Sequence, residues 1–139
     1  MAVAERRGAS RLQLMRTTFH LVPAEVWAVA EPALERGTDY AAASLATEGF
    51  IHCTDGLDEL AATFDRYYSG DPRAFLALTL DLDALDVPWR YDDPGSPYPH
   101  VYGPISRRAI VRVDRVECTP DGGFAGLATL VGGADRAPG

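Results

Sequence analysis

The sequence predicts an α+β fold whose helices are concentrated in the first half of the chain and whose strands dominate the second. Three segments lead to this prediction. Residues 17–22 are rich in β-branched and aromatic side chains, which favours a first strand. Residues 74–82 are almost entirely apolar, which predicts an interior strand covered on both faces. Residues 109–118 alternate apolar with polar positions, as a half-exposed strand does.

Two or three helices are expected between the first two of these strands. Pro23 suits the first turn of a helix, and residues 40–47 are alanine-rich and predict a second, short one. Apolar side chains then recur at steps of three and four residues, which predicts a third helix. The apolar positions of the first helix are Val26, Trp27, Val29 and Ala30, and those of the third are Leu57, Leu60, Ala61, Phe64, Tyr67 and Tyr68.

The second half adds a short strand at residues 87–91 and a loop at residues 92–97, where aspartate, proline and glycine cluster. The chain is therefore expected to form a flexible arm over residues 1–16, a single domain over residues 17–118 and an appendage over residues 119–139. Within the appendage, residues 124–131 are expected to dock as a last strand or a turn.

Composition restricts the classes of partner. The 139 residues match the usual size of one domain. The net charge is −7, and all 13 basic residues are arginines. This balance argues against long nucleic acid as a partner, because such binding needs a basic face. A small anionic ligand held by a few arginines is compatible with it.

The cysteines and the apolar runs predict a cytoplasmic protein. Cys53 and Cys118 lie far apart and lack metal-ligand spacing, so we expect two buried thiols in a reducing cytoplasm. Arginines interrupt the N-terminal segment where a signal peptide would be apolar. No run approaches the roughly 18 apolar residues that a membrane span requires.

The stretch over residues 48–55 is the centre of the functional prediction. An apolar strand carrying His52 runs directly into the third helix, with Thr54 or Asp55 as the expected N-cap. The free N–H groups at that helix end would form an anion site close to His52. The alternative is a core histidine whose ring is satisfied by a backbone carbonyl.

Each of the three histidines lies in or beside a predicted strand and next to an aromatic residue, so we expect at least two of them to face one cleft. They are His20, His52 and His100. A zinc site is the obvious alternative, although no two of them have local metal-ligand spacing. A serine hydrolase lacks its Gly-x-Ser-x-Gly turn here. Cys53 as a nucleophile beside His52 is disfavoured, because adjacent strand residues point to opposite faces.

Three segments carry a resemblance to a known family. They are Thr-Phe-His-Leu-Val at residues 18–22, Glu-Gly-Phe-Ile-His-Cys-Thr at 48–54 and Tyr-Pro-His-Val-Tyr-Gly-Pro-Ile at 98–105. Together they resemble the signature blocks of bacterial domain-of-unknown-function family 952, over residues 17–117. That family resembles the ADP-ribosyltransferase-like fold, a split β-structure that cradles NAD. The nearest pattern within that superfamily is that of the RNA 2′-phosphotransferases.

The resemblance implies a set of site residues with NAD as cosubstrate and no metal. The implied catalytic residues are His20, His52, His100 and Tyr102, and the implied cofactor-binding residues are His20, His52, Thr54 and Arg90. Two departures from the pattern stand out. The third block offers no glutamate to hold a ribose hydroxyl, and Arg90 stands where the family often has an acidic residue. A missing glutamate is compatible with a nucleophile that is already anionic, such as a phosphate.

The sequence thus predicts an NAD-binding, ADP-ribosyltransferase-like enzyme that acts on a small molecule or a phosphate ester. Catalysis would require holding the pyrophosphate, positioning the nicotinamide ribose and excluding water. One alternative is a biosynthetic acid–base enzyme, of cyclase or dehydratase type, that uses the same histidine-lined cleft without NAD. The other is a non-catalytic module that binds a small ligand.

Overall fold

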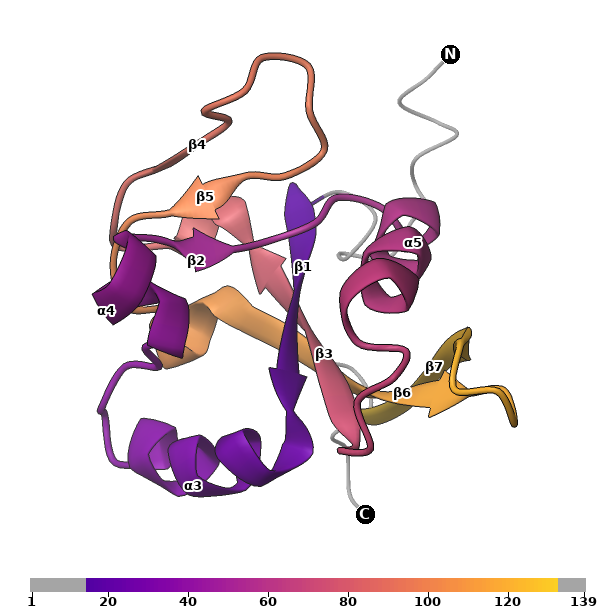
Figure 1. The fold of residues 1–139 in the computed structure, drawn as a ribbon. Coiled ribbons are helices and arrows are strands. Elements are labelled where there is room, and N and C mark those ends of the chain that lie inside the picture. The colour runs from indigo at the N-terminus through magenta and orange to yellow at the C-terminus, as the bar shows by residue number, and fades with distance from the viewer. Residues whose placement is uncertain (1–14, 133–139) are drawn as a thin grey trace, which may run out of the picture.

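A computed structural model describes residues 15–132 and shows two antiparallel sheets and three helices within them (Figure 1). The predicted α+β class is confirmed, and the three helices all lie in the first half of the chain. Most of the predicted arm at residues 1–16, and residues 133–139 of the predicted appendage, lie outside the described residues. Among those described, no helix has the length and apolar character to cross a membrane.

The large sheet has the strand order β1-β3-β6-β7. Its strands are β1 (Thr17–Pro23), β3 (Phe75–Asp81), β6 (Ile110–Cys118) and β7 (Phe124–Gly132). Phe75 to Leu80 are all buried, which confirms that this apolar segment is an interior strand. β6 alternates partly, as predicted for a half-exposed strand, and β7 forms the edge beside it within the segment predicted as an appendage.

The small sheet has the order β2-β5-β4, and each of its strands is two residues long. They are β2 (Ile51–His52), β5 (His100–Val101) and β4 (Trp89–Arg90). His52 pairs with His100, and Ile51 pairs with Val101. The chain beyond β2 then crosses to the large sheet, where Thr54 forms an isolated antiparallel bridge with Phe19 of β1. Two of the three sequence blocks therefore meet in the small sheet, and the third meets them at this bridge.

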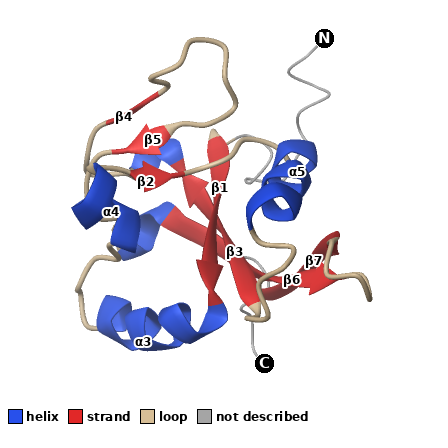
Figure 2. Cartoon of the chain, in the orientation of Figure 1, coloured by secondary structure: helices blue, strands red, loops and turns tan. Residues whose placement is uncertain are grey.

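Helices cover the large sheet from both sides. Figure 2 shows α3 (Ala24–Glu35) and α4 (Ala43–Glu48) on one side of β1 and α5 (Leu57–Tyr67) on the other. Leu60 and Phe64 of α5 pack with Phe75 and Val116 in one core cluster. Trp27 and Leu34 of α3 belong to a second, larger cluster that also includes the small sheet. A single-turn 3₁₀ helix, η1 (Leu82–Ala84), follows β3, and another, η2 (Arg107–Ala109), precedes β6.

Two local predictions about helix ends are wrong. The N-cap of α5 is Gly56 rather than Thr54 or Asp55, and no side chain caps that end. Thr54 cannot be the N-cap, because its backbone N–H and carbonyl both pair with Phe19. This pairing keeps the chain extended as far as Thr54, two residues before the observed N-cap, Gly56. Pro23 is the N-cap of α3 and the last residue of β1, not part of the first helical turn.

The predicted apolar face of α3 is only partly buried. Trp27 packs in the core, but Val29 is 78% exposed and Val26 is 42% exposed. The helix meets the sheet through Trp27 and Leu34, which lie seven residues apart on one face, so Val26 and Val29 point away from it.

Candidate functional site

A cleft of about 680 Å³ lies along β1, one of the two edge strands of the large sheet. Its walls come from α4 and the small sheet on one side and from the C-terminal half of α5 on the other. Figure 1 shows these elements on opposite sides of β1. All three histidines line it, and they come from the three sequence blocks. The prediction that at least two histidines face one cleft is confirmed. A cavity of this size lies in the usual range of small-molecule sites.

His20 forms the buried floor of the cleft. Its Nδ1–H donates to the backbone carbonyl of His52 at 2.7 Å, because a carbonyl can only accept. Nε2 must then be the acceptor, and it receives the hydroxyl proton of Tyr40 at 2.9 Å. Burial lowers the pKa of His20 to about 4, so the ring is neutral near neutral pH.

Tyr40 completes this buried pair. Its backbone exchanges two hydrogen bonds with Ile105, which fixes the residue between α3 and α4. Burial, the largest cause, raises the pKa of Tyr40, so its hydroxyl stays protonated and donates to His20. Since both nitrogens of His20 are occupied within the protein, His20 can act on a ligand only through Tyr40 or by moving.

His52 occupies an open position on the cleft wall and is paired with Glu48. Nε2 of His52 lies 3.0 Å from the Glu48 carboxylate, and both side chains are about half exposed. Gly49 makes this pairing possible, since it ends α4 in the left-handed conformation at φ 93° and turns the chain back into β2. The side chain of Ser44 adds a hydrogen bond of 2.8 Å to the carbonyl of Phe50, which holds the turn.

His100 faces His52 across the small sheet, with ring centroids 5.7 Å apart. The Phe50 ring stacks on His100 at 3.8 Å with an interplanar angle of 13°. Nδ1 of His100 lies 2.7 Å from the carboxylate of Asp92. Two imidazoles, each next to a carboxylate, therefore meet at one end of the cleft.

The predicted site residues outside the histidines have separate positions. Thr54 lines the cleft, whereas Arg90 and Tyr102 do not belong to its lining. Arg90 donates to Asp92 at 2.6 Å and lies over the Tyr102 ring at 4.2 Å. The Tyr102 hydroxyl also donates to Asp92. Both side chains thus join the carboxylate that holds His100.

The expected anion site at the start of α5 is not part of the cleft. Thr63, Arg66 and Tyr67, all from the C-terminal half of α5, line the cleft instead, and the first turn contributes none. That first turn also carries Asp58 and Glu59, which neutralise the positive helix end themselves. The positive charge in the cleft comes from side chains.

Two arginines supply that charge. Arg66 lies over the Tyr67 ring at 5.7 Å, and a hydrogen bond with Tyr98 raises the pKa of its guanidinium. Among the ion pairs of the described residues Arg66 has none, whereas Arg73 is paired with Asp71 at 2.7 Å. Arg66 is consequently the cation of the cleft that is available to an anionic ligand.

Sequence reasoning missed three contributors to this region. Tyr40 stands alone in an alanine-rich stretch, where nothing signals a functional role. Glu48 had a usable signal, since it precedes His52 by four residues across a glycine that is typical of a helix end. Asp92 lies in a segment whose composition predicts only a loop, and the pairing of β4 with β5 is what brings it to His100.

Cys53 is buried in the lining of the cleft, as predicted, whereas Cys118 is exposed, so the prediction of a buried thiol is wrong there. Burial raises the pKa of the Cys53 thiol. A protonated, desolvated thiol is a poor nucleophile, which agrees with the sequence argument against a cysteine enzyme. Within residues 15–132, no cluster of three or more histidine, cysteine or carboxylate side chains has a geometry able to hold a metal ion.

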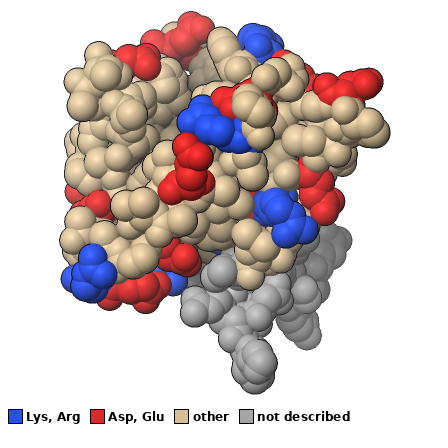
Figure 3. Space-filling model, turned by 60° about the horizontal axis from the view of Figure 1, so that its bottom comes forward, with Lys and Arg blue, Asp and Glu red and all other residues tan. Residues whose placement is uncertain are grey.

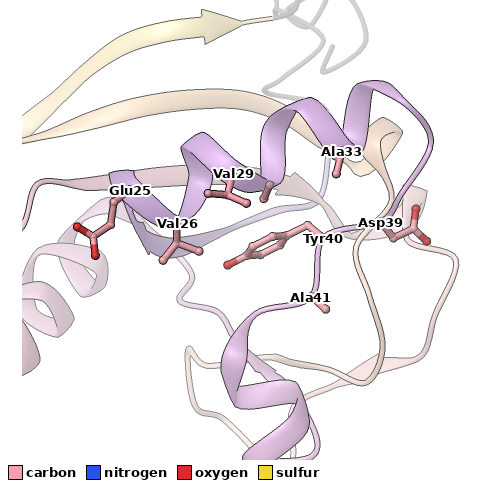
Figure 4. Close-up of a pocket in the computed structure, with 8 residues that line it drawn as sticks. Glu25, Val26, Val29, Ala33, Asp39, Tyr40 and Ala41 are labelled. Atoms are coloured by element: carbon pink, nitrogen blue, oxygen red, sulfur yellow. The ribbon is translucent and has the colours of Figure 1, made fainter.

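A second hollow of about 480 Å³ adjoins the cleft on the far side of Tyr40. Figure 4 shows the Tyr40 ring beneath α3, with Val26 and Val29 above it and Ala41 below. Tyr40 and Val26 line both cavities, so the two cavities are neighbours with the tyrosine ring as a shared wall. The exposed side chains of Val26 and Val29 on α3 therefore lie at the edge of this apolar hollow.

The distribution of surface charge is consistent with the net charge of −7. Figure 3 shows acidic and basic side chains interspersed on one face, and among the described residues drawn there no continuous basic area forms. Ion pairs such as Arg108 with Asp86, at 2.6 Å, bind several arginines to neighbouring carboxylates.

Comparison with known proteins places the fold. Two crystal structures of protein CC0527 from Caulobacter crescentus, one of them a double mutant, superpose with a TM-score of 0.60 at 20% sequence identity, covering 79% of this chain and 94% of theirs. The solution NMR structure of the same protein gives a TM-score of 0.59, also at 20% identity, over 77% and 90%. At this identity the likeness concerns the fold alone.

None of the curated proteins matches the chain. A family described as "Protein of unknown function (DUF952)" matches residues 21–113, a range that begins directly after His20 and contains the last three residues of β1, both walls of the cleft and the small sheet. This chain therefore belongs to the DUF952 family.

Proposed function

We propose that the cleft binds NAD and that the protein is an ADP-ribosyltransferase-like enzyme acting on a small molecule or a phosphate ester. One observation carries the proposal: a single cleft between two sheets gathers His20, His52 and His100 from three separate sequence blocks. The resemblance of these blocks to those of NAD-cradling folds supports the same assignment.

The lining of the cleft suits the parts of a dinucleotide. Arg66 offers a positive charge for a pyrophosphate, as guanidinium groups bind phosphates with two parallel hydrogen bonds. Tyr67, Tyr68 and Tyr98 offer rings that can stack on a nicotinamide or an adenine.

Glu48 supplies a carboxylate that the third block lacks. Breaking the bond between ribose and nicotinamide builds positive charge on the sugar, and a carboxylate in the cleft stabilises that charge. The same carboxylate can accept a hydrogen bond from a ribose hydroxyl. In this proposal His52 orients Glu48 through the contact of 3.0 Å, and the acceptor substrate approaches from the open side of the pair.

A second candidate is an acid–base enzyme that works without NAD. The specific observation in its favour is the pair of imidazoles, His52 and His100, whose ring centroids lie 5.7 Å apart and which each contact a carboxylate. Such an arrangement can take a proton at one ring and return it at the other. It fits the elimination or cyclisation of a small hydroxylated substrate.

A calorimetric titration with NAD, followed by an assay for released nicotinamide, separates these candidates. Binding with release supports the transferase, binding without release supports a binding module, and absence of binding favours the acid–base enzyme. Arg66→Gln should weaken NAD binding about tenfold or more, because it removes a charge-assisted contact to phosphate. Arg36→Gln, on the exposed C-cap of α3 outside the cleft, is the matched control and should leave affinity unchanged.

A further inference from the structure

Asp92 collects more polar contacts than any histidine of the cleft, although it does not line the cleft itself. One carboxylate oxygen accepts from Nε of Arg90 at 2.6 Å. The other accepts from the Tyr102 hydroxyl and lies 2.7 Å from Nδ1 of His100. These three contacts, led by that of Tyr102, lower the pKa of Asp92 to about 2, so the group is a carboxylate over the physiological range.

A carboxylate can only accept, so Nδ1 of His100 must carry the proton in this contact. The neutral ring then has its lone pair on Nε2, which has no hydrogen-bond partner among the described residues. Because His100 lines the cleft, this nitrogen is the one that remains for a ligand. The stacked Phe50 ring, at 3.8 Å, fixes the plane of the imidazole.

The loop that carries Asp92 is anchored at both ends. The Tyr91 hydroxyl donates to the Asp55 carboxylate at 2.5 Å. At the other end, the N–H of Asp55 donates to the carbonyl of Pro97 and that of Cys53 donates to the carbonyl of Pro99. The segment that leads from His52 into α5 therefore holds the loop, and with it Asp92, at a fixed place.

We propose that Asp92 is a positioning residue that holds His100 as the Nδ1-protonated tautomer and so presents Nε2 to the cleft as a proton acceptor. Arg90 and Tyr102 hold the carboxylate in place and act on the ligand only through it. The proposal rests on the proposed function in one respect, namely that the cleft is the site of binding. It assigns Arg90 and Tyr102 to a layer behind the cleft rather than to cofactor binding and catalysis.

In the proposed transfer, the acceptor oxygen would form its bond to the ribose carbon of NAD as the bond between that carbon and the nicotinamide nitrogen breaks, and Nε2 of His100 would take the proton that the acceptor hydroxyl loses. The ring would then be an imidazolium stabilised by the Asp92 carboxylate. Nicotinamide leaves as a neutral molecule and needs no proton, so the same nitrogen would release the proton to water, which restores the neutral ring. No further reactant is needed for this cycle.

The tautomer can be observed directly without any ligand. Long-range proton–nitrogen NMR spectra of the ¹⁵N-labelled full chain resolve each imidazole nitrogen, and the chain has only three histidines. In the wild type we expect His100 to be the Nδ1–H tautomer. Asp92→Ala should shift it toward the Nε2–H form, and Asp92→Asn, which keeps an oxygen acceptor, should shift it less.

The controls sit in the same molecule. Asp93→Ala changes the neighbouring exposed carboxylate of the loop and should leave the His100 signals in place. The tautomer of His20, fixed by the carbonyl of His52, should be unchanged in every variant and reports that the fold is intact. If His100 keeps the wild-type tautomer in Asp92→Ala, or shifts as much in Asp93→Ala, the positioning role of Asp92 is refuted.

An activity measurement tests whether the position of His100 matters for catalysis. In the nicotinamide-release assay, Asp92→Ala should lower kcat by about tenfold or more with KM for NAD little changed, as loss of a positioned base does. If the wild type releases no nicotinamide, the proposed function fails while the NMR result still decides the role of Asp92. An unchanged kcat in a variant whose tautomer has shifted would overturn the role of His100 as base.

Discussion

At the scale of residues, the Tyr40 hydroxyl satisfies Nε2 of His20 and so fixes the ring that forms the buried floor of the cleft. His20 lies 6% exposed on β1, and its two ring nitrogens are satisfied by a carbonyl and by the Tyr40 hydroxyl. A buried polar group without a partner costs free energy, so each contact stabilises the other. The ring of Tyr40 also separates the cleft from the apolar hollow beneath α3.

Tyr40→Phe should therefore lower the free energy of unfolding by about 1–3 kcal/mol, since Nε2 of His20 would lose its buried partner. Urea unfolding followed by circular dichroism would measure the loss. Tyr98→Phe is the matched control, because it removes an exposed hydroxyl bonded to Glu59 at 3.3 Å and should cost little. Equal losses in the two variants would contradict the importance of the buried pair.

His20 also predicts a dependence of stability on pH. Burial lowers its pKa from 6.5 to about 4, so between these values the unfolded chain binds a proton that the folded protein does not. The folded protein therefore has its full free energy of unfolding above about pH 6.5, where the His20 ring is neutral in both states. The free energy of unfolding falls as the pH drops toward about 4, because the unfolded chain gains the proton. The size of this fall is on the order of 3 kcal/mol.

Unfolding free energies measured at several pH values between about 4 and 7 would test this, with His20→Gln beside the wild type. The wild type should show a steeper decline with falling pH, by close to one proton in this window. A decline of the same slope in both proteins would mean that His20 is not held neutral by burial.

At the scale of elements, the turn from α4 into β2 decides the geometry of Glu48 and His52. Gly49 adopts φ 93°, a conformation that side chains with a Cβ rarely take. The backbone N–H of Gly49 closes the last turn of α4 by donating to the carbonyls of Ser44 and Leu45. Glu48 and His52 thus face each other because the helix ends where it does.

Gly49→Ala should cost about 1–2 kcal/mol of stability, which is the cost of the left-handed conformation for an L-residue. No atom lies within 4 Å of the added methyl group, so steric clash plays no part. Gly70→Ala has equally open space and no positive φ, which makes it the control with little expected effect. Thermal unfolding would compare them, and a loss as large in Gly70→Ala would contradict the backbone argument.

Elements are also the scale at which sequence reasoning succeeded most. The long strands were predictable because β1, β3 and β6 carry strong patterns of apolar residues. The caps were not, because the backbone of Thr54 is taken by a bridge to Phe19, a contact 35 positions away in the chain. Likewise, His20, His52 and His100 could be predicted to converge, but the roles of Arg90 and Tyr102 depend on a loop carboxylate whose position no local pattern gives.

Over the whole molecule, the large sheet separates two cores. Leu60 is fully buried between α5 and the sheet, whereas Leu57, one turn earlier on the same helix, is 51% exposed. The side of the cleft formed by Arg66 and Tyr67 depends on how firmly α5 is held by this smaller core.

Leu60→Ala should consequently destabilise the protein by about 2–5 kcal/mol through the cavity that it leaves. Leu57→Ala should change stability by less than about 0.5 kcal/mol, as surface substitutions usually do. Denaturant unfolding would measure both. Similar values for the two leucines would show that α5 is not packed on the sheet in solution as described.

The two-residue strands of the small sheet have a consequence for amide hydrogen exchange. β2 and β5 share two residue pairs, whereas β1 and β3 share seven. Breaking the small sheet would free few backbone hydrogen bonds and leave the core on the α5 side intact, so its amides should exchange by local opening while those of β3 wait for global unfolding. Ligand binding would then slow exchange most at residues 51, 52, 100 and 101, and the pattern of slowed amides would map the occupied part of the cleft before any ligand is seen in a structure.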